Sequence, residues 1–277
     1  MNILAFLTDF GLKEHFTGTM KGVALSVSPD IRLFDITHHI QPYNIWEAGL
    51  TLAFTLPFWP RETVFVCVTD PGVGTSRKSI VALTNDDKYI VTPDNGTLTF
   101  ILNKPGIQAI REINEHSNRR PGSEDFHTFH GRDVYAYTGA RLASGIIPFE
   151  DIGDKLSSDP VSIQYQTAAM SDTGKISGTV MKIEAPFGNL VTNIPQNLFT
   201  DFKKNRPDST YKTYILKDRS LMYDEKLPFV SSFGHVQAGQ PILYIDSNGF
   251  LGIAANQAHF AKQNNIGFGN EWKIEIT

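Results

Sequence analysis

Two patterns of hydrophobic and polar positions divide the chain near residue 155. Before that point, short apolar or β-branched runs bounded by turn residues predict strands, and apolar positions three or four residues apart predict helices between them. The predicted strands cover 3–8, 31–36, 64–69, 79–83 and 89–91, and the predicted helices cover 15–27, 45–56 and 133–144. Strands that alternate with helices favour an α/β sandwich, in which helices cover a mostly parallel sheet.

After residue 175 the pattern is one of strands separated by Gly and Asn turns. It predicts a smaller C-terminal antiparallel β domain with a barrel-like sheet. Its predicted strands cover 176–183, 189–194, 211–217, 241–245, 250–255 and 271–276. The stretch before them is polar and has no sustained period, which is typical of a linker. We therefore expect an N-terminal α/β domain at 1–156, a linker at 157–175 and a C-terminal β domain at 176–277.

The composition is that of a folded protein with few charges. Hydrophobic residues make up 41% of the chain, which excludes bulk disorder. The 25 Lys and Arg against 29 Asp and Glu give a net charge of −4, so there is no basic footprint for a nucleic acid. Charged residues are only 19%, and this favours an oligomer because subunit interfaces are depleted in charge.

The single cysteine and the first residues indicate the compartment. Cys67 is the only cysteine, so no intrachain disulfide can form. It lies in the apolar run 64–68, where a small core residue is expected. The start of the chain lacks a basic leader and reaches Asp9 almost at once, which predicts a first strand rather than a signal peptide. No apolar run approaches the ~20 residues that a membrane span needs. We expect a cytoplasmic protein with no membrane partner.

Polar residues that a core would exclude follow several predicted strands, at 8–11, 35–39, 69–77 and 92–96. Ligands of open α/β sheets bind beyond the carboxyl ends of the strands, so these loops are expected to converge on one site. Gly72 and Gly74 in the third loop would let a ligand approach the backbone. That loop lacks the Lys-Ser/Thr ending of a phosphate loop, and it does not predict a nucleoside triphosphate site.

Several of these residues have two interpretations. Asp9 either caps the following helix or binds both hydroxyls of a ribose, and Asp70 either shapes the Asp-Pro-Gly turn or faces a ligand. Phe187, beside a Gly-Asn turn in the C-terminal part, is either a core ring or a planar wall for a base. Asp133 is expected to cap the helix at 133–144, with His130 in the loop just before it.

Histidines raise the question of a metal ion. Together with Asp9 and Asp70 they are the residue types of a hydrolytic metal site. None of the helical His-x-x-x-His or cysteine-based spacings is present, so we expect no metal. His38 and His39 are expected instead to end a strand and line a subunit or ligand surface.

Taken in order, these motifs resemble those of one family, the S-adenosyl-L-methionine hydroxide adenosyltransferases, which are relatives of the fluorinase and chlorinase. The resemblance runs over essentially the whole chain. In the N-terminal part it covers 8–11 (TDFG), 69–74 (TDPGVG) with Arg77, 93–96 (PDNG) and 128–133 (TFHGRD). In the C-terminal part it covers 187–189 (FGN), 192–194 (TNI), 247–249 (SNG) and 256–257 (NQ).

The resemblance implies an N-terminal α/β domain, a C-terminal β domain and a homotrimer whose substrate lies between subunits. The implied reaction is displacement at C5′ of S-adenosyl-L-methionine (SAM) by water or hydroxide, giving adenosine and L-methionine without a cofactor. The implied catalytic set is Asp70, Arg77 and His130, with the base among them left open. The implied substrate-binding residues are Asp9 for the ribose, Tyr43 over the substrate, and Phe10, Phe129, Glu184, Phe187, Asn189, Phe233, Ser247 and Gln257.

The chemistry fits that reaction. A sulfonium leaves as a neutral thioether, so neither a general acid nor a Lewis-acid metal is needed at the leaving group. The water must be held in line with the C5′–S bond and lose a proton, and both alignment and proton transfer are tasks for positioned side chains.

Three other functions bear on the assignment. The halogenases resemble this chain but have a tyrosine in place of Asp70, and a fluorinase carries an insertion at the turn 84–88. An ionised Asp70 would repel a halide, which favours the hydrolase. A metal-dependent hydrolase using the Asp and His residues, and a non-catalytic SAM- or adenosine-binding protein, remain the alternatives. Glu184 departs from the Asp frequent in the family, which weakens its link to the methionine amine.

Overall fold

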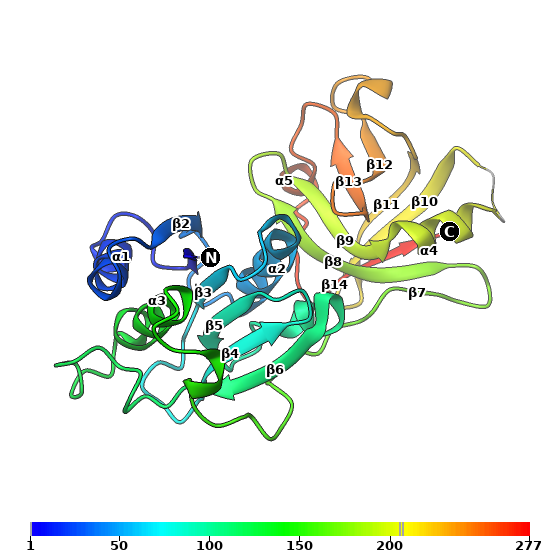
Figure 1. The fold of residues 1–277 in the computed structure, drawn as a ribbon. Coiled ribbons are helices and arrows are strands. Elements are labelled where there is room, and N and C mark those ends of the chain that lie inside the picture. Colours follow the sequence, from blue (N-terminus) through cyan, green and yellow to red (C-terminus); the bar gives the residue numbers. More distant parts are fainter. Residues whose placement is uncertain (1, 205, 207) are drawn as a thin grey trace. The chain divides into compact units, whose positions relative to one another are not determined.

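The structure, a computed structural model, describes residues 2–204, 206 and 208–277 (Figure 1). The chain divides into two compact units, Met1–Ile163 and Gln164–Thr277, and each is described by itself. The division falls within the polar stretch 157–175.

The first unit is built on a sheet with the strand order β2-β1-β3-β5-β4-β6. β1 pairs parallel with β2 and β3, and β3 with β5, whereas β4 pairs antiparallel with β5 and β6. The strands are β1 (Ile3–Thr8), β2 (Arg32–Thr37), β3 (Val64–Val68), β4 (Ser79–Thr84), β5 (Tyr89–Pro93) and β6 (Ile107–Glu112).

Both faces of this sheet are covered, which explains why its central strands are apolar throughout. Leu4 and Phe6 of β1 pack in one core with Met20 of helix α1 (Phe16–Val27) and with helix α3 (Tyr137–Ala143). Their neighbours Ala5 and Leu7 pack in a second core with helix α2 (Ile45–Thr55). The predicted α/β sandwich is confirmed, and Cys67 is fully buried in the second core.

The second unit is an antiparallel sheet with the strand order β11-β10-β14-β8-β9-β13-β12, and β7 pairs with β8. The two ends of this order approach each other where Phe229, just after β11, bridges Leu243 of β12. The sheet is therefore nearly closed, as the predicted barrel-like domain requires. Its strands are β7 (Ala169–Met170), β8 (Ile176–Glu184), β9 (Asn189–Pro195), β10 (Thr210–Lys217), β11 (Ser220–Pro228), β12 (Pro241–Ile245), β13 (Phe250–Ala255) and β14 (Trp272–Ile276).

Several elements were not predicted from the sequence: β6, β7 within the expected linker, β11, helix α4 (Gln196–Lys204) and helix α5 (Phe260–Gln263). β11 lies at the end of the strand order and has three consecutive charged residues at 224–226, so it shows little apolar alternation. The remaining short turns are 3-10 helices η1 (Leu56–Phe58), η2 (Thr99–Ile101), η5 (Phe149–Asp151) and η6 (Phe233–His235), and π-helices η3 (Leu102–Gly106) and η4 (Gly131–Ala136).

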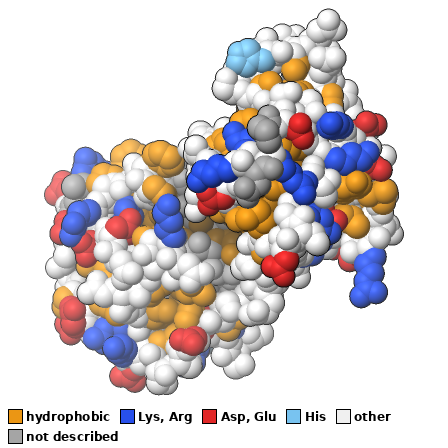
Figure 2. Space-filling view, turned by 90° about the vertical axis from the view of Figure 1, so that its right-hand side faces the viewer, with side chains coloured by type: hydrophobic (Ala, Val, Ile, Leu, Met, Phe, Trp, Pro, Cys, Tyr) orange, Lys and Arg blue, Asp and Glu red, His pale blue; other side chains and the backbone are white. Residues whose placement is uncertain are grey.

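The surface and the helices add two observations on partners. On the face shown in Figure 2, Lys and Arg side chains lie interspersed with Asp and Glu. Within the described residues, every helix is too short or too polar to pass through a bilayer.

The contact of α3 with the sheet leads to a test of the first core. A Cβ at Gly139 would lie 2.7 Å from Val66 Cγ2 and 3.1 Å from Leu4 Cδ1, both on buried strands. We expect Gly139→Ala to lower the free energy of unfolding by about 1–3 kcal/mol through overpacking. Gly22→Ala on α1, where a Cβ meets no atom within 4 Å, is expected to raise it by about 0.5–1 kcal/mol. Urea unfolding measures both, and equal effects would contradict the packing argument.

Candidate active site

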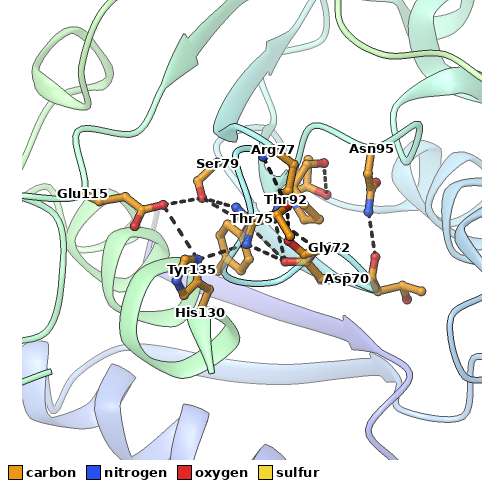
Figure 3. A network of polar contacts seen from close by, with 12 residues as sticks. Asp70, Gly72, Thr75, Arg77, Ser79, Thr92, Asn95, Glu115, His130 and Tyr135 are labelled. Carbon is orange, nitrogen blue, oxygen red and sulfur yellow. Dashed lines mark hydrogen bonds and ion pairs between the residues drawn. The ribbon is translucent and has the colours of Figure 1, made fainter. Parts of the chain in front are cut away.

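The loop between β3 and β4 carries the first part of the site. Asp70 follows the end of β3, and Arg77 reaches back across the loop to it (Figure 3). Arg77 Nε donates to both carboxylate oxygens, at 3.1 and 3.0 Å, and Nη2 donates to Oδ2 at 2.7 Å. The two side chains are 10% and 5% exposed, so this is a buried, charge-assisted pair.

The loop between β3 and β4 requires a glycine at position 74. Gly74 has a φ of +76°, and a Cβ there would lie 2.8 Å from the carbonyl oxygen of His127. Neighbouring motifs are tied to the same loop, because Asn95 Nδ2 donates to the carbonyl oxygen of Thr69 at 2.9 Å. The sequence-predicted loops thus converge as expected from the carboxyl edge of the sheet.

His130 joins the pair from the start of η4. The residue is buried, and its Nδ1 lies 3.0 Å from Arg77 Nη2. Arg77 therefore contacts both Asp70 and His130. The structure brings together the three residues that the sequence indicated as the catalytic set.

Residues that sequence reasoning missed complete this network. Ser79 Oγ accepts from Arg77 Nη1 at 2.9 Å and donates to Glu115 Oε1 at 2.8 Å. Tyr135 is fully buried, and its hydroxyl lies 3.5 Å from Asp70 Oδ2. Glu115 follows β6, a strand that was not predicted, and β6 pairs with β4 beside Ser79. No local motif marks Glu115; the pairing of β4 with β6 brings it there.

The surroundings of His130 favour its neutral form. Burial lowers the pKa of His130; the charge of Glu115 raises it, and the charges of Arg77 and Arg119 lower it again, leaving it below its ordinary value. The pKa of Glu115 is lowered as well: burial raises it, but hydrogen bonds from Ser79 and Arg119 outweigh that effect. At neutral pH the site therefore contains a neutral imidazole and an ionised Glu115.

A cavity of about 480 Å³ lies against this network. Asp70 and His130 are on its wall, and the rings of Phe10, Phe16 and Phe129 line another part of it. These three rings meet edge to face at 5.3–5.9 Å between centroids, which fixes their orientation. A polar wall facing a fixed aromatic wall suits an organic ligand with one polar reacting end.

Asp9 and Tyr43 form a second contact at the carboxyl ends of β1 and β2. Tyr43 N–H donates to Asp9 Oδ2 at 2.8 Å, and Tyr43 has a φ of +68°, rare for a residue other than glycine. Burial raises the pKa of Asp9, although the N–H of Tyr43 opposes the rise. Helix α1 begins only at Phe16, so the interpretation of Asp9 as its cap is wrong. Neither Asp9 nor Tyr43 lines the cavity.

Two sequence interpretations near the site are corrected. His38 does not line a surface: it is buried, its Nδ1 lies 2.8 Å from Thr8 Oγ1, and its Nε2 lies 2.9 Å from Asp35 Oδ1. Asp133 does not cap a helix, because η4 begins at Gly131; its buried carboxylate accepts hydrogen bonds from Arg120 and Arg132 instead. These polar groups stabilise buried turns.

Across residues 2–204, 206 and 208–277, no three His, Cys, Asp or Glu side chains gather as a metal ion would require.

The C-terminal candidates gather at a cavity of about 810 Å³ in the second unit. Gly188, with a φ of +72°, turns the chain between β8 and β9, and a Cβ there would overlap the ring of His259. Phe187 is 65% exposed beside this turn, so the core-ring interpretation is wrong and the ring forms part of the cavity wall. The lining includes Glu184, Phe187, Asn189, Phe233, Ser247 and Gln257, the whole C-terminal set that the sequence indicated.

Comparison with known proteins identifies a family whose two domains span both sets of residues. The model of the SAM hydroxide adenosyltransferase N-terminal domain matches residues 4–153, and that of the C-terminal domain matches residues 178–273. The chain belongs to the SAM hydroxide adenosyltransferase family. The N-terminal match contains the Asp70–Arg77–His130 network, and the C-terminal match contains the lining of the larger cavity.

Individual relatives match this chain over nearly its full length, and they are named for two different activities. An (R)-S-adenosyl-L-methionine hydrolase from Methanocaldococcus jannaschii is 34% identical over 99% of this chain and 96% of its own length. A fluorinase from Actinoplanes sp. is 30% identical over 95% of this chain and 94% of its own. An uncharacterised conserved protein from Thermotoga maritima has a crystal structure that matches with a TM-score of 0.86 at 36% identity, covering 99% of both chains.

The buried pair of Asp70 and Arg77 leads to a stability test. Arg77→Met leaves the Asp70 carboxylate buried without its cation, and we expect a loss of about 3 kcal/mol in the free energy of unfolding. Lys78→Met next to it breaks an exposed pair with Glu112, whose side chains are 44% and 42% exposed, and should change that energy by at most about 0.5 kcal/mol. Chemical denaturation compares the two variants, and losses of similar size would contradict the burial argument.

Proposed function

We propose that this protein hydrolyses S-adenosyl-L-methionine by attack of water on C5′, giving adenosine and L-methionine. The observation that carries the proposal is the chain of contacts from Asp70 through Arg77 to His130 on the wall of a cavity. Family membership supports it, as do relatives named (R)-S-adenosyl-L-methionine hydrolase in three organisms, Methanocaldococcus jannaschii, Salinispora tropica and Thermus thermophilus.

The proposed step balances without a cofactor. The water oxygen forms a bond to C5′ while the C5′–S bond breaks, and its electron pair stays on sulfur. The sulfonium becomes the neutral thioether of methionine, so the leaving group needs neither a proton nor a Lewis acid. The water loses one proton, and the protein must hold the water in line and accept that proton.

The chain's own residues divide this task. Asp70 offers acceptor oxygens to the water, and Arg77 fixes the direction of Asp70 and of the neutral His130 by contacting each. Arg77 also places a positive charge 2.7 Å from the largely buried Asp70 carboxylate. The site thereby combines orientation with a proton acceptor.

The remaining family positions are proposed to bind the substrate. Asp9 would take the ribose hydroxyls and Tyr43 would lie over the substrate, with Phe10 and Phe129 beside the reacting end. In the second unit the lining of the larger cavity would hold the adenine and methionine ends: Glu184, Phe187, Asn189, Phe233, Ser247 and Gln257.

The nucleophile is proposed to be water rather than a halide. Asp70 is on the wall of the smaller cavity, and an ionised carboxylate repels an anion that would approach C5′ from there. His130 is held neutral and supplies no compensating positive charge. Relatives named fluorinase share the fold of the family, but these two groups favour a neutral nucleophile.

The assembly is proposed to be a homotrimer with substrate bound between subunits, as the family resemblance implies. The low share of charged residues, 19%, and exposed apolar side chains such as Leu12, Phe34 and Phe58 support an interface between copies. Light scattering after gel filtration is expected to give about three times the 30.9 kDa of one chain. The mass of a single chain would overturn this assembly.

The activity is tested by incubating the purified protein with SAM and quantifying adenosine and methionine by chromatography, with and without EDTA. Equimolar products that EDTA does not change are expected. Asp70→Asn, Arg77→Met and His130→Asn are each expected to lower kcat by about 10²-fold or more, with the fold retained by circular dichroism. EDTA-sensitive turnover would favour a metal-dependent hydrolase, and binding without products would favour a binding protein.

Two controls accompany this assay. Asp9→Asn is expected to raise KM more than it lowers kcat, because its proposed contact is with the ribose and not with the reacting atoms. Added fluoride or chloride is expected to leave adenosine as the product. A 5′-halogenated nucleoside would contradict the choice of water as nucleophile.

A further inference from the structure

His130 lies between two guanidinium groups. Its Nδ1 is 3.0 Å from Arg77 Nη2, and its Nε2 is 3.2 Å from Arg119 Nη2. The same Arg119 nitrogen donates to Glu115 Oε2 at 2.7 Å, and the Arg119 side chain is only 9% exposed. The described charged groups that face His130 are thus Asp70 and Arg77 from the β3–β4 loop, and Glu115 and Arg119 from the segment after β6.

This arrangement has a direct consequence for the imidazole. A neutral imidazole has one N–H and one lone pair, whereas a protonated ring has two N–H groups and no acceptor. Both ring nitrogens of His130 face guanidinium N–H groups, which cannot be deprotonated. The neutral ring accepts from only one of the two guanidinium groups, whereas the protonated ring accepts from neither and places a third cation between two others. Arg119 acts against the charged ring.

Glu115 acts in the opposite sense. Its Oε1 lies 3.8 Å from His130 Nδ1 and accepts a hydrogen bond from Ser79, and its Oε2 holds Arg119. An ionised carboxylate at this distance stabilises an imidazolium. Glu115 and Arg119 thus form a pair whose members push the protonation of the same ring in opposite directions.

We propose that Glu115 and Arg119 are positioning residues, acting through His130, whose opposed charges set the protonation state and the orientation of its imidazole. The expected effect on catalysis rests on the proposed function, whereas the expected effect on the protonation of His130 does not. Neither residue lines the smaller cavity, so neither is placed to touch substrate there.

Arg119 also has a structural contact that the test must separate. Its Nη1 lies 3.1 Å from the carbonyl oxygen of Phe126 and 3.4 Å from that of Ser123, so it anchors the loop before His130. Loss of that anchor alone would lower activity, but it would not shift the pKa of His130 in a defined direction. The signs of the two shifts, rather than the loss of activity, are therefore the decisive readout.

The experiment titrates His130 in the full chain by long-range ¹H–¹⁵N NMR of histidine-labelled protein, with its signal assigned by its absence in His130→Asn. Glu115→Gln is expected to lower the pKa of His130, because a stabilising negative charge is lost. Arg119→Gln is expected to raise it, because a repelling positive charge is lost, while Arg119→Lys keeps the charge and should stay near wild type. The double variant Glu115→Gln/Arg119→Gln should lie between the two single variants.

Glu112→Gln and Arg141→Gln are the matched controls. Glu112 pairs with Lys78, and Arg141 bonds Asn118 and the carbonyl oxygen of Ser117, so both should leave the titration unchanged. Shifts of the same sign in the two test variants, or no shifts, would overturn the inference. Where Arg119→Gln does not fold, Glu115→Gln decides alone: a pKa at or above that of wild type refutes the proposal.

The same variants are then followed by activity against pH. With neutral His130 as the active form, kcat falls as the pH drops through its pKa, so the acidic limb of the wild type lies below pH 6.5, the ordinary value. At a fixed pH on that limb, relative to its own plateau, Glu115→Gln should retain about three- to tenfold more activity than wild type and Arg119→Gln correspondingly less. If the wild type releases no adenosine, the proposed function fails, while the titration still decides the role of the pair.

Discussion

The guanidinium of Arg77 connects the loop between β3 and β4, the start of β4 and the start of η4, which is 53 residues further along the chain. It bonds Asp70 after β3, Ser79 at the start of β4 and His130 at the start of η4, and it is 10% exposed. A planar fork with fixed donor directions can hold three partners in one geometry, which a lysine ammonium on a flexible stem cannot do. The relative positions of Asp70 and His130 therefore depend on one side chain.

The structure separates the candidate residues into two groups by their chemistry. Ionisable residues that could take part in a proton transfer lie in the first unit, around the smaller cavity. The larger cavity of the second unit has rings, amides and hydroxyls, with Glu184 and Asp246 as its carboxylates and His259 as its imidazole. Such a lining suits recognition of a base and an amino-acid end more than bond breaking. The family assignment is consistent with this division, because its two domains match the two units.

Sequence reasoning succeeded where one physical cause acts locally. The buried strands β1 and β3 are apolar because both faces of the sheet are covered, and such runs are visible without any knowledge of the fold. It failed where the cause is a neighbour in space. β11 is a strand because β10 pairs with it, and its own residues are mostly exposed. Glu115 belongs to the network because β6 pairs with β4, and Asp133 is held by two arginines rather than by a helix end.

The contact between Asp9 and Tyr43 has a consequence for how this family can vary. A tyrosine at a φ of +68° carries a conformational penalty of about 1–2 kcal/mol, and the bond from its N–H to Asp9 offsets part of it. The carboxylate that ends β1 thereby holds the backbone that follows β2. A substitution at position 9 that removes the acceptor oxygen leaves the backbone at 43 without this hydrogen bond, so the conformation of one loop depends on a side chain of the other.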